Sequence, residues 1–292
     1  MAESFVLRNT AGDSLTLAVM EHDGLGMAPV RRQTNQGPTQ HGQTLVAARL
    51  RPRIVTLKLK VTGTSASNLW TQHNLYTRMM NQINAQFYLD VTLDSGATRR
   101  LDVAYYQGLT LSREARLSRA YTTLEMLQLI ADDPILYDAT PISYSFGLGG
   151  GGTGTPVPLI VPTTIGSSVI DDTQTITYNG TWEEYPVIKI TGPLEDAKVE
   201  NLTTDEVLDF DGTTIAAGDY YEIDLRYGYK TVTDSTGANK LADLTSDSDL
   251  ATWHLAPHPE ATNGINSIQV TGTSATGATN VAVTYYTRYL GL

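Results

Sequence analysis

The chain has 292 residues, of which 41% are apolar and 17% are charged, and it contains no cysteine. This composition provides enough apolar side chains for buried cores, and it excludes a disordered chain, a disulfide framework, a thiolate metal site and a cysteine nucleophile. The first residues lack the basic and apolar segments of a secretory signal, and no run reaches the roughly 18 apolar residues of a membrane helix, so we expect no membrane anchoring.

The net charge of −11 is unevenly distributed along the chain. Residues 1–140 hold 14 Lys and Arg against 12 Asp and Glu, whereas residues 141–292 hold 6 against 19. The acidic half would be repelled by phosphates, which argues against general affinity for DNA. We expect the acidic half to form a solvated outer surface and the nearly neutral half to pack against further copies of the chain.

The first half predicts an α+β domain. Alternating apolar and polar residues predict strands, and one stretch with helical spacing predicts a helix that begins at Ser65 or Ser67. A polar segment at 24–47 reads as a long loop, and such a loop inside a compact domain usually has a functional role. The expected strands are 5–9, 14–19, 53–61, 87–93, 99–111 and 121–132.

A stretch rich in glycine and proline marks the predicted domain boundary. Residues 146–154 read FGLGGGGTG, and three prolines follow by residue 162. Glycine allows backbone angles that other residues avoid, and proline removes a donor from a strand ladder, so a linker is expected here. We therefore predict a first domain at 1–145, a linker at 146–165 and a second domain at 166–292.

The second domain is predicted to consist of strands and turns. Short strands separated by regular turn signals are typical of an antiparallel β-sandwich. The expected strands are 169–180, 185–193, 198–204, 206–210, 219–228, 229–234, 251–256, 265–272 and 280–290.

No catalytic or cofactor motif accompanies these elements. The glycine-rich stretch lacks the lysine of a phosphate loop. His254 and His258 have the spacing of helical metal ligands, but nearby prolines forbid a helix, so a strand end followed by a surface turn is the preferred interpretation. The acidic pairs are adjacent in sequence and would point to opposite faces of a strand, which suits a glycosidase poorly. We predict no catalytic residue, no metal site, no cofactor and no enzymatic activity.

Two sets of residues are candidates for recognition. Arg49, Arg51 and Arg53 alternate along a predicted strand, so they would share a face that either meets acidic groups of a neighbouring subunit or is simply solvated. Trp182 and Trp253 would form a platform for a sugar ring, or act as core anchors. The core is preferred for Trp253, whereas Trp182, beside Gly180 and two glutamates, fits either role.

The second half contains a characteristic order of motifs: GTWEEYPVIKITGP at 180–193, VENLTTDEVLDFDG at 199–212, TTIAAGDYYEIDLRYGYKTV at 213–232, and the closing pair INSIQVTG and NVAVTYYTRYLGL. This order resembles the distal tail proteins of siphophages, which are bacteriophages with long non-contractile tails. The first half is similar in its order of elements, which ends in ADDPILYD at 131–138, so the resemblance spans nearly the whole chain.

The resemblance implies a mainly β fold, with an N-terminal α+β belt domain, like a split barrel with one helix, and a C-terminal galectin-like β-sandwich. It implies a structural protein of the virion, assembled in the host cytoplasm, that forms a homo-hexameric ring at the tail tip or baseplate. The ring would join the tail tube protein to the tail hub or fibre protein around a channel for DNA, with 24–47 as a contact arm. The alternatives are a carbohydrate-binding module that recognises a host glycan, and another minor tail protein of the same fold.

Overall fold

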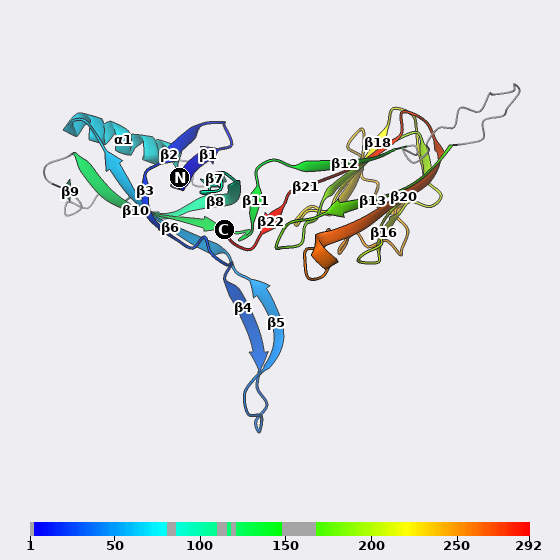
Figure 1. The fold of residues 1–292 in the computed structure, drawn as a ribbon, viewed down its shortest axis with the longest axis horizontal. Helices are drawn as coiled ribbons and strands as arrows, with labels where there is room; N and C mark the ends of the chain where they lie inside the picture. The colour runs from blue at the N-terminus through cyan, green and yellow to red at the C-terminus, as the bar shows by residue number, and fades with distance from the viewer. Residues whose placement is uncertain (1–2, 81–85, 110–115, 118–120, 148–167) are drawn as a thin grey trace, which may run out of the picture. The chain divides into compact units, whose positions relative to one another are not determined.

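The computed structural model describes residues 3–80, 86–109, 116–117, 121–147 and 168–292 (Figure 1). These residues are mainly in β-strands, with one α-helix among them, which confirms the predicted fold class. The chain divides into two compact units: unit 1 comprises Met1–Ala139 and Tyr289–Leu292, and unit 2 comprises Thr140–Arg288.

The boundary between the units differs from the predicted one. β12 (Ile142–Gly147) pairs with β21 (Asn280–Tyr285), so the chain has already entered unit 2 before the glycine-rich stretch begins. Residues 148–167, where the linker was expected, lie outside the described residues. The described strands on either side of them both belong to unit 2, so the boundary between the units lies before the predicted linker.

Unit 1 is built on a ten-stranded sheet. Its strands are β1 (Ser4–Asn9), β2 (Ser14–Leu17), β3 (Val19–Asp23), β6 (Arg53–Thr62), β7 (Phe87–Thr92), β8 (Thr98–Gly108), β9 (Arg116–Leu117), β10 (Thr122–Ala131), β11 (Leu136–Asp138) and β22 (Arg288–Tyr289). The main path runs β2–β1–β7–β8–β10–β6–β3. Every second residue of β6 from Arg53 to Val61 is buried, as the alternation in its sequence predicts.

The helix α1 (Ala66–Met79) begins at one of the two predicted caps. Ser65 has an extended backbone, and its Oγ accepts a hydrogen bond from the Asn68 backbone N at 3.1 Å. A serine at this position satisfies a backbone donor that the first turn of a helix leaves unpaired. The helix buries His73, Tyr76 and Met79, and it packs against β6.

The polar segment predicted as a loop contains a hairpin. β4 (Val30–Asn35) pairs antiparallel with β5 (Thr44–Leu50) as a separate two-stranded sheet. Figure 1 shows this hairpin projecting away from the other strands of unit 1. Nearly all of its residues are exposed, so neither face carries the apolar stripe that would have predicted strands. We call residues 30–50 the arm.

Unit 2 has the predicted sandwich form. One five-stranded sheet contains β12, β21, β14 (Val187–Thr191), β18 (Tyr220–Asp224) and β19 (Thr231–Asp234) in that order. The other contains β13 (Ser168–Thr177), β20 (Ile265–Ala275), β15 (Leu194–Asn201) and β16 (Glu206–Asp209), with β17 (Thr214–Ile215) beside β15. Buried side chains from both sheets form a single core. The segment 251–256 was predicted as a strand, but it makes turns and one isolated bridge. Unit 2 also contains the short 3-10 helices η2 (Leu241–Asp243) and η3 (Thr262–Gly264).

Candidate functional site

The arm presents a cationic surface. Arg31 on β4 lies directly opposite Arg49 on β5, and Arg32 and Arg51 are also exposed. The sequence contains no Asp or Glu between residues 24 and 89, and in the described part of the chain none of these four arginines has an ion pair. Like charges directly opposite each other destabilise a strand pair, so an acidic partner surface would stabilise this hairpin.

Apolar side chains are exposed on and beside the arm. They are Met27, Val30, Leu45 and Val46, which are 77%, 52%, 47% and 60% exposed. Interfaces between proteins combine apolar contacts with arginine in this way. The arm therefore has the composition of a contact surface for another chain.

The three arginines predicted to share one strand face are separated in the structure. Arg49 lies on β5 and Arg51 follows its end, and both are exposed. Arg53 begins β6 and is only 1% exposed, so its expected place at a subunit interface is wrong. The prediction assumed one continuous strand, but β5 ends at Leu50 and a different strand begins at Arg53.

Arg53 is enclosed by backbone carbonyl groups. Its Nε donates to Pro134 O at 2.9 Å, its Nη1 donates to Gly24 O and Gly26 O at 3.0 and 2.6 Å, and its Nη2 donates to Leu290 O at 2.6 Å. Burial lowers the pKa of Arg53, but a guanidinium remains charged in proteins, so the four carbonyl dipoles stabilise a buried cation.

The last described residues fix the root of the arm. Leu290 O also accepts a hydrogen bond from Ala28 N at 2.9 Å, and Leu292 N donates to Leu25 O at 3.0 Å. Arg99 donates to Gly291 O at 2.6 Å, and its guanidinium lies 3.8 Å from the centroid of the Tyr289 ring. Residues 24–28, which lead into β4, are therefore held both by Arg53 and by residues 290–292.

The two tryptophans predicted as a sugar platform have different environments. Trp253 is 0% exposed and lies in the core of unit 2, so its indole is not available to a ligand. This is the core position that its sequence favoured. Trp182 is half-buried, and its backbone carbonyl accepts a hydrogen bond from the Tyr178 hydroxyl at 2.7 Å.

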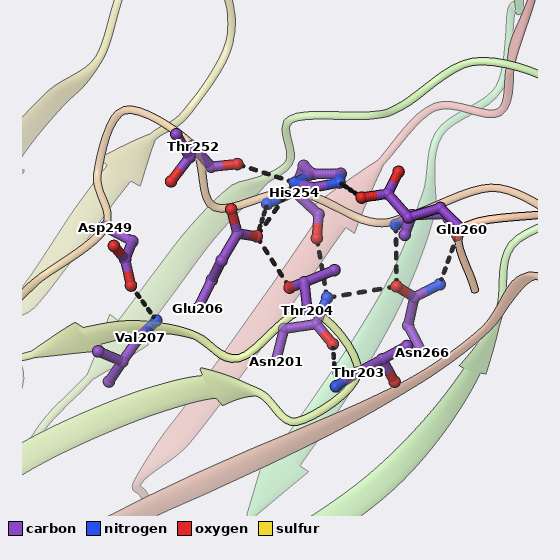
Figure 2. A network of polar contacts seen from close by, with 11 residues as sticks. Asn201, Thr203, Thr204, Glu206, Val207, Asp249, Thr252, His254, Glu260 and Asn266 are labelled. Carbon is purple, nitrogen blue, oxygen red and sulfur yellow. Dashed lines mark hydrogen bonds and ion pairs between the residues drawn. The ribbon is translucent and has the colours of Figure 1, made fainter.

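A polar network connects Thr252 and His254 with Asn201 and Glu206 (Figure 2). His254 is buried rather than on a surface turn: its Nδ1 lies 3.0 Å from Glu206 Oε2, and its Nε2 lies 3.3 Å from Glu260 Oε1. Burial opposes the charge on His254, but the hydrogen bonds with Glu206 and the Thr252 carbonyl outweigh it and raise the pKa of His254 to about 9. Burial likewise opposes the charge on Glu206, and the hydrogen bond with His254 lowers the pKa of that carboxyl.

Two buried asparagines complete the network. Asn201 Nδ2 donates to the His254 carbonyl at 2.8 Å and to Asn266 Oδ1 at 3.2 Å. Asn266 donates to Ala256 O and accepts from Ala256 N, both at 2.9 Å. These bonds supply the irregular segment 254–256 with partners that a regular strand ladder would otherwise provide. Among the described residues no group of three or more His, Cys, Asp or Glu could hold a metal ion.

We expect the stability of unit 2 to depend on the charge of His254. Because its pKa is raised in the folded state, the stabilisation is complete below the unfolded value of 6.5 and is lost as the pH rises through about 9. The loss should amount to roughly 2–3 kcal/mol. Calorimetry of the full chain at pH 6 and pH 9.5, which follows the unfolding of unit 2, measures this loss of stability. His254→Gln should abolish this pH dependence, whereas the exposed His258→Gln should retain it, and identical pH profiles for wild type and His254→Gln would contradict the assignment.

The part of the chain that the structure describes contains no helix with the length and apolarity needed to cross a membrane.

Comparison with solved structures identifies the fold. The chain is similar to the crystal structure of the Dit protein of phage SPP1, a paradigm of the hub adsorption apparatus in phages that infect Gram-positive bacteria. The TM-score is 0.68 at 10% identity, over 97% of this chain and 98% of that chain. It is also similar to a chain of the phage P2 baseplate in its activated conformation with calcium, with a TM-score of 0.49 at 12% identity, over 97% and 98%. The resemblance expected from the sequence is thus confirmed for the fold.

No family model and no curated protein sequence matches the chain.

Proposed function

We propose that this chain is a distal tail protein: a structural component of the tip of a long, non-contractile phage tail, where six copies form a ring. The arm carries the proposal. It is exposed on both faces, it combines three arginines with apolar side chains, and within the described residues it pairs with no other sheet. The Dit-like fold supports the same role.

The asymmetry of such an arm suits a ring. A projecting element contacts a different surface of the next copy, and a repeated head-to-tail contact of this kind forms a ring when the rotation from copy to copy closes. The arm is cationic while the chain as a whole has a net charge of −11, so each copy offers acidic groups to the arm of another copy. Arg31 and Arg49 are placed to make these contacts, since each lacks an ion pair among the described residues.

The ring would join the tail tube protein on one side to the hub or fibre protein on the other. Assembly takes place in the host cytoplasm, and DNA passes through the channel of the finished tail. This role requires positioning and strength, not chemistry, so it needs no cofactor and no catalytic residue.

We expect the purified chain to form a closed species of six times the 31.7 kDa of one copy, or a dimer of such rings, in size-exclusion chromatography with light scattering. Reversing two arm charges, Arg31→Glu with Arg49→Glu, should give monomers, because the arm would then repel the acidic groups of the next copy. The double variant Lys60→Glu with Arg78→Glu, exposed residues outside the arm, has the same net charge and should still assemble. A monomeric wild type, or an arm variant that still forms rings, would overturn the proposal.

A further inference from the structure

A hollow of about 310 Å³ opens on the outer face of one sheet of unit 2. The inner residues of these strands, including Ile188, Ile190 and Val283, are buried in the core, so the alternate residues that line the hollow face outward. The lining residues are Glu184, Tyr185, Val187, Lys189, Glu222, Arg226, Ala282, Thr284 and Tyr286.

The register of three strands creates the hollow. Val187 on β14 lies opposite Thr284 on β21, and Lys189 lies opposite Ala282. Three neighbouring lining side chains, those of Val187, Ala282 and Thr284, are therefore short, and longer ones such as Tyr185 and Tyr286 also line the hollow. The volume is at the lower end of the roughly 300–1,000 Å³ that small-molecule sites occupy.

The rim carries charges of both signs. Arg226 is held in place by bonds from its Nε and Nη2 to Asp224, at 2.9 and 2.6 Å, and its side chain remains 46% exposed. Lys189 Nζ lies 3.6 Å from the centroid of the Tyr220 ring, and the exposed Glu222 lies on the neighbouring strand. The rim therefore offers fixed hydrogen-bond donors beside an acceptor.

A second carboxylate, Glu184, lies deeper in the wall of the hollow. Glu184 is 4% exposed, its Oε1 accepts a hydrogen bond from Tyr286 N at 3.0 Å, and its Oε2 lies 3.7 Å from Arg288 Nε. The negative charge of Glu184 is thus balanced by Arg288, and the positive charge of Arg226 by Asp224. Lys189 and Glu222 remain as one charge of each sign, so the hollow has no excess of either sign.

We propose that this hollow binds a neutral saccharide of one or two pyranose rings. A sugar hydroxyl both donates and accepts hydrogen bonds, so it uses carboxylate and cationic side chains together. The apolar face of a pyranose ring suits the floor of Val187, Ala282 and the Thr284 methyl group, with tyrosines at the edge. A ligand with a net negative charge would be repelled by Glu222, and a ligand with a net positive charge would be repelled by Lys189 and Arg226. Neither Trp182 nor Trp253 lines this site, which therefore differs from the platform expected from the sequence.

The test is saturation-transfer NMR on the full chain with neutral methyl glycosides of glucose, galactose, rhamnose and N-acetylglucosamine. At least one should receive saturation from the wild type, and Thr284→Trp, which fills the hollow, should weaken its binding at least tenfold. Thr173→Trp places the same side chain on an exposed position of β13 in the other sheet and should bind as the wild type does.

A second variant keeps the test decisive if Thr284→Trp fails to fold. Lys189→Gln removes a rim cation without filling the hollow, and it should weaken binding severalfold. The proposal is overturned if no neutral glycoside binds, if Thr284→Trp binds as well as wild type, or if only the charged sugars glucuronate and glucosamine bind. These outcomes do not depend on whether the chain forms a ring.

Discussion

Replacing Arg53 by methionine is expected to destabilise unit 1 by about 3–5 kcal/mol. Methionine retains most of the side-chain volume, but it leaves the carbonyl groups of Pro134, Gly24, Gly26 and Leu290 without their shared donor. A buried acceptor that loses its partner costs its full desolvation energy, and this applies to the carbonyl groups of Pro134, Gly24 and Gly26, because Leu290 O keeps its bond from Ala28 N. Hydrogen exchange of peptides from β6 and β10, compared with peptides from β14 and β20, measures the effect for each unit separately.

The matched control lies two residues earlier. Arg51 is exposed and its side chain makes no bond within the described residues, so Arg51→Met should change the stability of unit 1 by no more than about 0.5 kcal/mol. Equal hydrogen-exchange rates in the two variants would show that the bonds from Arg53 to the four surrounding carbonyl groups, here called the carbonyl cage, do not stabilise unit 1. Because the cage also holds the residues that lead into the arm, Arg53→Met should impair ring assembly even where β6 and β10 remain protected.

Local patterns predicted the elements whose stability depends on neighbours in sequence. The alternation in residues 53–61 identified β6, because one face of that strand is buried over its whole length. Ser65, one of the two candidate caps, marks the start of the helix, because a cap bonds to a backbone group only three residues away. The arm followed neither rule: a hairpin exposed on both faces has no apolar stripe, so its sequence resembles a loop.

Two features that the sequence did not predict, the burial of Arg53 and the position of the domain boundary, depend on contacts between residues far apart in the chain. Arg53 is buried because carbonyl groups from residue 24 to residue 290 surround it, and no spacing within a strand reports such partners. The domain boundary was misplaced for the same reason. Composition predicted a linker at 146–165, but only the pairing of β12 with β21 shows that the strand before it belongs to unit 2.

The candidate sites of unit 2 also combine features that local sequence predicts with features that long-range contacts determine. The prolines around His254 correctly excluded a helix, but its burial depends on Glu206 and Asn201, which come from β16 and β15. The hollow depends on which residues of β14, β18 and β21 lie side by side. That register is set by the packing of the whole sandwich, so the short side chains at the floor of the hollow carry no local signal.

Trp253→Ala should destabilise unit 2 by roughly 3–5 kcal/mol. The indole is 0% exposed within the core, so its removal leaves a cavity that the two sheets cannot fully close. Its Nε1 makes no hydrogen bond with any described residue, so the loss is one of packing, and Trp253→Phe should recover more than half of it. Thermal unfolding of unit 2, followed by calorimetry, measures both.

Trp182→Ala is the comparison that separates packing from recognition. Trp182 is half-buried, so its replacement should cost unit 2 less than half of what Trp253→Ala costs. Because Trp182 does not line the hollow, the variant should also retain the glycoside binding that Thr284→Trp abolishes. If Trp182→Ala instead removed sugar binding while unit 2 remained stable, the indole would be the platform and the hollow would not. Sugar recognition would then depend on a half-buried aromatic ring beside the core rather than on the register of three strands.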